Sequence, residues 1–253
     1  MQQTQHTDPE ALLARRLGDD ALVMGQRLCE WCANAPTLEE ELALANVALD
    51  YLGRARFCYA HAGAALDRTE DELAFLRDAA EFENLLMVEL PRGDFAFTMV
   101  RQYLLDVFEL LYFAGLSQSG SKGLAAIAAK THKEVQYHLR RSRQWLRQLA
   151  LGTTVSRDRT EAALDELWGY VEELFAMDAL ESALVDAGIG VDRQALRADW
   201  MLEVEGLLSQ LELVKPAADW QVHGGRQGVH TEHLGHLLAQ MQFMQRAYPG
   251  LQW

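Results

Sequence analysis

The stretch Lys133-Glu134-Val135-Gln136-Tyr137-His138, at the centre of residues 122–150, decides the fold. Around it, residues recur at intervals of three and four and so form one face of a helix. They are Leu124, Ile127, Thr131, Val135, Ser142, Leu146 and Leu149. Glu134 and His138 fall at the edge of this inward face, where a carboxylate and an imidazole are costly to bury without partners. They indicate a metal site, the remnant of one, or a hydrogen-bonded core network.

The composition is that of an ordinary globular protein, with 253 residues, 49% hydrophobic residues and five prolines. A net charge of −14 argues against nucleic acid or an anionic membrane as the main partner, because phosphate binding needs clustered Lys and Arg. The chain lacks the apolar run of about 18 residues that predicts a membrane-spanning helix, and Met1–Asp8 lacks a signal-peptide pattern. Three cysteines fit a reducing cytosol better than a disulfide framework.

Capping signals and apolar periodicity predict long helices with short loops. The predicted helices span residues 9–33, 37–65, 69–87, 95–116, 122–150, 156–177, 178–187, 192–211 and 231–247. The first of them has a potential break at Gly18, with Asp19-Asp20 as a restart. The pattern predicts an all-α bundle of four long helices with additional C-terminal helices, folded as a single domain over residues 1–253.

A ferritin-like metal bundle needs a Glu on each of two helices and Glu-x-x-His on each of two others. Here Asp50 and Gly53 stand at the Glu and His positions of the second helix, and Glu134 and Tyr137 at those of the fourth long helix. Glycine cannot ligate, and His138 comes one residue late. Two missing histidines leave too few nitrogen donors for a typical non-haem iron site.

The remaining donors come from the other two long helices, which offer Gln26, Glu30, Gln102, Asp106 and Glu109. We expect a paired polar network in the bundle interior; its predicted members are Asp50, Arg54, Asp106, Glu134 and His138. In that network Glu134 pairs with Arg54 or His138. Two alternatives stay open. One is a metal enzyme that uses Glu134, His138, Asp106 and Asp50, and the other is a small-molecule pocket in the same place.

Cys29-Glu30-Trp31-Cys32 forms a CxxC motif. A zinc site needs two further ligands and a redox motif needs a βαβ context, and the sequence predicts neither. We therefore interpret the two cysteines as small residues packed within a helix.

His230, His233 and His236 recur three residues apart, so they can share one helix face and could bind a divalent metal. However, Thr231 is placed as an N-cap, and Glu232 in the first turn suits the helix dipole. The arrangement favours a hydrogen-bonded cluster at the end of the bundle over a metal site.

Six stretches share a family pattern: Leu17–Asp20, Arg27–Cys32, Ala43–Asn46, Leu49–Arg56, Lys133–Arg140 and Gly228–Gly235. Together with Gln240–Gly250, the most specific segment, they resemble the C subunit of the bacterial phenylacetyl-CoA oxygenase (ring 1,2-epoxidase) complex. The similarity extends from about residue 17 to Trp253.

The resemblance implies a ferritin-like fold and a role in aerobic phenylacetate degradation in the cytoplasm. In that family a sister A subunit holds the di-iron centre and inserts oxygen, while a flavin and iron–sulfur reductase subunit supplies electrons from NADPH. The C subunit is expected to hold no cofactor and to pair with the A subunit as a structural partner. The resemblance also suggests that Ser182, Ala183 and Leu184 approach the CoA part of phenylacetyl-CoA bound mainly in the A subunit.

Overall fold

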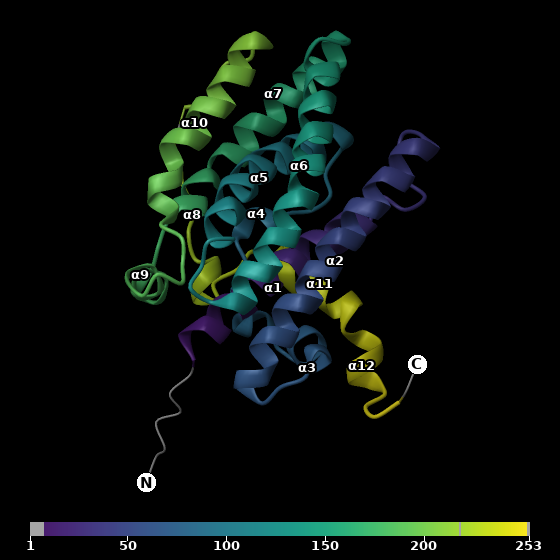
Figure 1. The fold of residues 1–253 in the computed structure, drawn as a ribbon. Helices are drawn as coiled ribbons and strands as arrows, with labels where there is room; N and C mark the ends of the chain where they lie inside the picture. The colour runs from purple at the N-terminus through teal and green to yellow at the C-terminus, as the bar shows by residue number, and fades with distance from the viewer. Residues whose placement is uncertain (1–7, 218, 252–253) are drawn as a thin grey trace.

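Four long helices form the body of the protein in the computed structural model, which describes residues 8–217 and 219–251 (Figure 1). They are α1 (Pro9–Cys29), α2 (Leu38–Leu66), α5 (Phe95–Leu116) and α6 (Lys122–Ala150). Helix α1 packs along α2, α5 packs along α6, and α2 also contacts α6. The described ranges contain no strand. The predicted all-α, ferritin-like fold is confirmed.

Shorter helices surround this body: α3 (Glu70–Phe75), the 3₁₀ turn η1 (Ala79–Glu81), α4 (Leu86–Glu89), α7 (Thr154–Trp168), α8 (Val171–Phe175), α9 (Ala179–Asp186), α10 (Arg193–Gln210), the 3₁₀ turn η2 (Gly225–Gln227), α11 (Glu232–Met241) and α12 (Phe243–Ala247). Helices α7 and α10 pack on α5, whereas α12 projects from the opposite lower side in Figure 1. No helix in the described ranges is long and apolar enough to cross a membrane.

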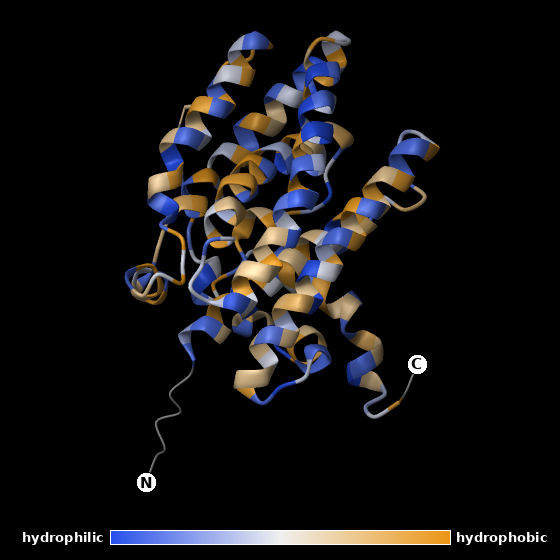
Figure 2. Ribbon diagram, in the orientation of Figure 1, coloured by the Kyte–Doolittle hydropathy of each residue, from blue (hydrophilic) through white to orange (hydrophobic). Residues whose placement is uncertain are grey.

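The two helices at the centre of the prediction, α5 and α6, have the predicted bounds. Each begins at a side-chain cap: Asp94 accepts from the Phe97 amide at 2.9 Å, and Ser121 accepts from the Leu124 amide at 3.3 Å. Helix α5 is apolar almost throughout, whereas α6 alternates between polar and apolar residues (Figure 2). The difference follows from position, because α5 is covered by α6, α7 and α10.

The predicted third helix over residues 69–87 is wrong: α3 ends at Phe75, and the chain then runs in short turns to α4. The cause lies on α1. The amide of Glu83 donates to the Asp19 carboxylate at 2.9 Å, and the amide of Leu85 donates to Asp20 at 2.7 Å. These acids do not restart α1 after Gly18, since α1 is continuous; they bind the backbone of the neighbouring segment instead.

Two other predicted helices are each split in two. The helix over residues 156–177 breaks at Gly169, where the Trp220 ring packs so closely that an added Cβ would lie 2.2 Å from it. The helix over residues 231–247 breaks at Gln242, which is buried and donates to the Ala74 and Arg77 carbonyls at 3.2 and 3.0 Å. In both places a contact distant in sequence overrides local helix propensity.

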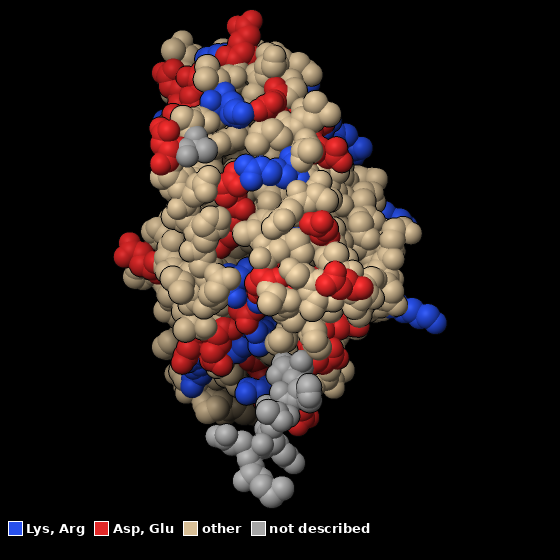
Figure 3. All heavy atoms as spheres, turned by 90° about the vertical axis from the view of Figure 1, so that its left-hand side faces the viewer, with Lys and Arg blue, Asp and Glu red and all other residues tan. Residues whose placement is uncertain are grey.

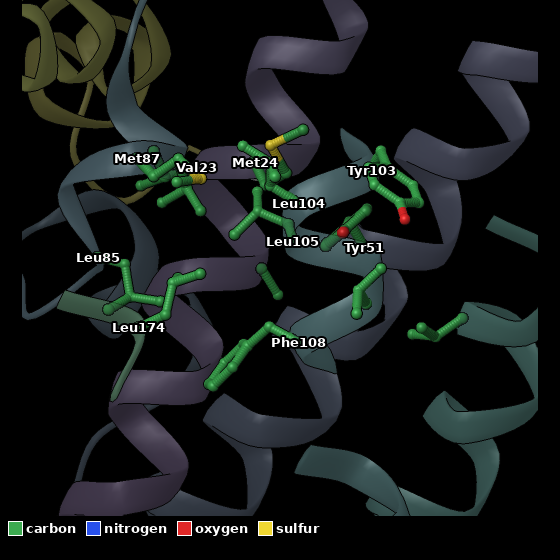
Figure 4. Packing of buried hydrophobic residues seen from close by; sticks show 14 of the residues in the cluster. Val23, Met24, Tyr51, Leu85, Met87, Tyr103, Leu104, Leu105, Phe108 and Leu174 are labelled. Atoms are coloured by element: carbon green, nitrogen blue, oxygen red, sulfur yellow. The ribbon is translucent and has the colours of Figure 1, made fainter. Parts of the chain in front are cut away.

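The apolar core runs through the four long helices and continues to α7, α8, α10 and the segment before α4. Figure 4 shows Val23 and Met24 of α1 facing Leu104 and Leu105 of α5, with Leu85 and Leu174 beyond them. All six side chains are buried. The core holds α5 rigidly and so fixes the polar residues that α5 directs toward α2 and α6.

At two glycines, replacement by alanine is expected to change the stability of the protein in opposite directions. A Cβ on Gly18 would lie 2.6 Å from the Tyr59 ring, which is itself fixed by a 2.7 Å hydrogen bond to Asp19. Gly53 lies inside α2, and among the residues that the structure describes nothing lies within 4 Å of its Cβ position. In urea unfolding of the isolated chain we expect Gly18→Ala to cost about 1–3 kcal/mol and Gly53→Ala to add about 0.5–1 kcal/mol. Equal effects would contradict the packing described.

Candidate functional site

Three helices direct polar side chains into the bundle interior. Helix α5 contributes Gln102, Asp106 and Glu109. They are four and then three residues apart, so they lie on one face of the helix. Helices α2 and α6 supply the partners, which are Asp50, Tyr51, Arg54, His138 and Ser142. Because α5 is rigidly packed on both sides, these groups meet in fixed positions.

A buried ion pair joins α2 to α5. Arg54 Nη1 lies 2.7 Å from Glu109 Oε1, and the Tyr51 hydroxyl donates to Glu109 Oε2 at 3.1 Å. The guanidinium carbon of Arg54 also lies 4.4 Å from the Tyr51 ring centroid and 4.9 Å from that of Phe113. Burial alone would lower the pKa of Arg54, but the Glu109 charge more than offsets it and raises that pKa above its ordinary value. Arg54 therefore stays charged.

Asp106 is the second buried carboxylate, and it joins α5 to α6. Gln102 Nε2 donates to Asp106 Oδ1 and Ser142 Oγ donates to Asp106 Oδ2, both at 2.6 Å. Gln102 Nε2 also donates to the Tyr51 hydroxyl at 3.1 Å and so links the two carboxylates in one chain. Complete burial raises the pKa of Asp106 from 3.8 to about 7, although both hydrogen bonds act in the other direction.

His138 and Asp50 form a third pair, at the edge of the bundle. His138 Nε2 lies 2.9 Å from Asp50 Oδ2, and the imidazole stacks on Tyr51 with ring centroids 5.6 Å apart. His138 is buried, but the Asp50 side chain is 37% exposed. The prediction that these two residues belong to one polar network is confirmed, and their contact fixes α6 against α2.

The predicted partner of Glu134 is wrong. Glu134 forms an ion pair with Lys130, one turn earlier on the surface of α6, and not with Arg54 or His138. Gly53 has no side chain to offer, and Tyr137 is 42% exposed. The network therefore contains Asp106, Arg54, Asp50 and His138 from the predicted set but not Glu134. The residues that sequence reasoning missed as partners are Tyr51, Gln102, Glu109 and Ser142.

The donors in this interior do not fit a di-iron centre. In the described ranges, no group of three or more His, Cys, Asp and Glu side chains is arranged to hold a metal ion. Asp106 uses both oxygens as acceptors, and Arg54 neutralises Glu109, so both buried carboxylates already have partners. Gly53 and the outward Tyr137 stand where the pattern requires histidine.

A small cavity adjoins the Arg54–Glu109 pair. Its volume is about 20 Å³, and its polar lining includes Asp20, Arg193 and Arg226. That volume suits about one water molecule, which has several hydrogen-bonding groups there to bind. The cavity is far too small for a substrate-sized ligand, so the structure gives no support to a small-molecule pocket at this place.

A second polar cluster lies at the end of the bundle, before α11. His230 Nδ1 lies 2.7 Å from Glu89 Oε2, its Nε2 lies 2.8 Å from the Phe82 carbonyl, and the Thr231 amide donates to Glu89 Oε1 at 2.6 Å. Burial alone would lower the pKa of His230, but the hydrogen bonds to Glu89 and Phe82 outweigh it and raise that pKa. These contacts dock the segment before α11 onto α4.

The other residues of the predicted histidine cluster lie elsewhere. His230 precedes α11, which begins at the exposed Glu232. The backbone carbonyl of His233 accepts from Arg27 Nη2 at 3.0 Å, and His236 is exposed. The motif thus contributes one buried imidazole and a backbone contact.

We expect His230→Ala to loosen this docked segment, because it removes one hydrogen-bond partner of the fully buried Glu89. The expected loss of unfolding free energy is about 1–3 kcal/mol. Hydrogen exchange of residues 224–241 should accelerate, while exchange in α5 and α6 stays unchanged. His236→Ala is the matched control, since that side chain is exposed. Equal exchange in the two variants would contradict the assignment.

The remaining sequence candidates lie outside both clusters. On α9, Ser182 and Ala183 are exposed and Leu184 is buried, so their contact with CoA stays a prediction. Cys29 is the half-buried last residue of α1, and Cys32 is exposed beyond it. The prediction that both cysteines pack within a helix is therefore wrong for Cys32, because α1 ends earlier than the periodicity suggests.

Comparison with known proteins agrees with the sequence pattern. A family model described as phenylacetic acid catabolic protein matches residues 1–253. The C subunit of the 1,2-phenylacetyl-CoA epoxidase of Escherichia coli (strain K12) is 48% identical over 239 residues, which are 94% of this chain and 96% of that protein.

Proposed function

The chain belongs to the phenylacetic acid catabolic protein family, and from this membership we propose that it is the non-catalytic structural subunit of a phenylacetyl-CoA 1,2-epoxidase. In this proposal it pairs with a catalytic A subunit in the cytoplasm. The A subunit holds the di-iron centre and binds phenylacetyl-CoA, and a reductase subunit with flavin and iron–sulfur groups supplies the electrons.

The observation that carries the proposal is the buried Arg54–Glu109 pair. A guanidinium cation neutralises the carboxylate on α5 and lies against the Tyr51 and Phe113 rings, in the bundle interior where a ferritin-like enzyme holds its metal. Charge balance in this interior is supplied by the protein itself. The interior then serves to join helices rather than to bind oxygen.

The network explains how a structural partner of this kind would support the A subunit. It connects α2 to α5 through Arg54 and Glu109, α5 to α6 through Asp106 and Ser142, and α6 to α2 through His138. Three helices are thus held in register by directional contacts. A rigid bundle presents its outer faces to a partner without an ordering cost on association.

The test is co-expression with the A subunit, followed by affinity capture and metal analysis. We expect the two chains to co-purify as a stable complex, with iron in the complex and none bound stoichiometrically to this chain purified alone. About two irons per isolated chain, lost in Asp106→Ala, would establish the alternative of a metal enzyme in its own right. Failure of the two chains to associate would overturn the proposed pairing.

A further inference from the structure

The outward face of α2 carries several large apolar side chains. Its exposed large side chains are Leu38, Leu42, Leu49 and Phe57, with exposed fractions of 68%, 58%, 64% and 48%. They recur at intervals of four, seven and eight residues along about 28 Å of the helix. Leu38, Leu42 and Leu49 lie on one line, which ends at the exposed Arg56, and Phe57 lies beside that line. Single exposed apolar residues are normal, but several on one side of a helix mark an interaction surface.

The neighbouring face of α6 is basic. Its outward residues are Lys130, Lys133, Tyr137 and Arg140, all of them exposed. Lys130 Nζ lies 5.4 Å from the Phe57 ring, which places the two stripes side by side. The chain has four lysines, at positions 122, 130, 133 and 215, and three of them lie in the first half of α6. In a chain with a net charge of −14 this concentration is distinctive.

Together these two stripes form what we call the α2–α6 face. The surface on the side of α8–α10 differs from it. On the side of α8–α10, acidic and basic groups lie next to each other along the molecule (Figure 3), and they form ion pairs such as Arg197–Glu172 and Arg143–Glu203. Within the described residues, Lys133 and Arg140 form no such ion pair.

We infer that the catalytic A subunit docks on the α2–α6 face through an apolar surface bordered by Asp and Glu side chains. The inference rests on the proposed function and adds the location and the chemistry of the contact. Acidic groups on the partner would pair with Lys133 and Arg140, and its apolar groups would cover Leu42, Leu49 and Phe57.

Charge argues against a second copy of this chain as the occupant. In a two-fold symmetric contact the same patch meets itself, so the lysine row of α6 would meet a lysine row or lie across an unmatched apolar stripe. Like charges facing each other across an interface disfavour the complex. A partner whose apolar surface is bordered by acidic side chains can cover the apolar residues of α2 and pair with the basic residues of α6 at the same time.

Gly53 lies on α2 between Leu49 and Phe57, and no atom of the described part of the chain lies within 4 Å of its Cβ position. A glycine inside an exposed helix costs about 0.8–1 kcal/mol relative to alanine, and within residues 8–217 and 219–251 no contact requires it. A close approach by the backbone of another helix would require it. Gly53 is therefore the expected point of closest contact with the partner.

The test uses full-length chain and A subunit in a binding measurement such as calorimetry or interferometry. Leu49→Glu should weaken the complex at least about 30-fold, because it introduces a charge at the centre of the apolar stripe. Lys133→Glu should mainly slow association and reduce its salt dependence. The matched control is Leu202→Glu on α10, where the leucine is 75% exposed on another side; its affinity should stay within about twofold of wild type.

Each result decides a separate point. If wild type does not bind the A subunit, the proposed function fails. If wild type binds and Leu49→Glu binds equally well with an unchanged melting temperature, the pairing stands and the assigned face is wrong. Equal losses in Leu49→Glu and Leu202→Glu would also overturn the assignment. Sedimentation that shows a wild-type homodimer abolished by Leu49→Glu would replace the A subunit with a second copy as the occupant.

Discussion

Glu109→Ala is expected to lower the free energy of unfolding by about 3–5 kcal/mol, one of the two largest effects that the structure predicts. The substitution leaves the Arg54 guanidinium buried without its counter-charge and removes the acceptor of the Tyr51 hydroxyl. Part of this cost is ordinary loss of packing, but most comes from a stranded charge that the surrounding rings cannot solvate.

A double-mutant cycle separates these terms. Its members are Arg54→Met, Glu109→Leu and the variant that carries both. The double variant removes both charges and keeps the volume, so it should recover most of the stability lost by Glu109→Leu alone. Urea unfolding of the isolated chain measures it. The control is Glu134→Gln, which disturbs the pair with the half-exposed Lys130 within α6 and should cost about 0.3–0.5 kcal/mol. A small effect of Glu109→Ala would show that the Arg54 charge reaches water.

The success of the sequence-based prediction for α5 and α6 has a local cause. Asp94 and Ser121 are caps, and the spacing of apolar residues in both helices is continuous between cap and loop. The structure of residues 69–87, in contrast, depends on contacts with distant parts of the chain. Its backbone amides bind Asp19 and Asp20, which are more than 60 positions away in the sequence. Local helix propensity therefore cannot predict where this segment leaves the helical conformation.

In the candidate site, too, the sequence predicted some contacts and not others. Spacing placed His138 on the edge of the inward face, and the Asp50 contact agrees with that placement. Spacing could not decide which carboxylate Arg54 would meet, because Glu109 and Glu134 lie on different helices. A signal was nevertheless present: Gln102, Asp106 and Glu109 share one face of a mostly apolar helix. Three polar groups on such a face must find partners inside the bundle.

Asp106→Asn is expected to stabilise the protein above pH 7 and to leave it nearly unchanged at pH 4. Burial raises the pKa of Asp106 to about 7, from an ordinary value of 3.8. The folded protein therefore holds this proton more tightly than the unfolded chain, and stability falls as the pH rises from about 4 to about 7. Above that range the loss is constant at roughly 4 kcal/mol, and an uncharged side chain avoids it.

The asparagine can keep the hydrogen bonds of the aspartate. Its Oδ1 accepts from Gln102, and its Nδ2 can donate to Ser142 Oγ, whose own hydrogen is free to reach the Leu139 carbonyl at 3.3 Å. Thermal unfolding of wild type and variant at pH 4, 6 and 8 tests the difference, because other titrating groups cancel in the comparison. Asp106→Ala is the control for the hydrogen bonds: it also removes the charge, so it should be less stable than Asp106→Asn at every pH. A pH-independent difference between Asp106→Asn and wild type would show that Asp106 is charged throughout this range, so that the network, and not burial, sets its protonation.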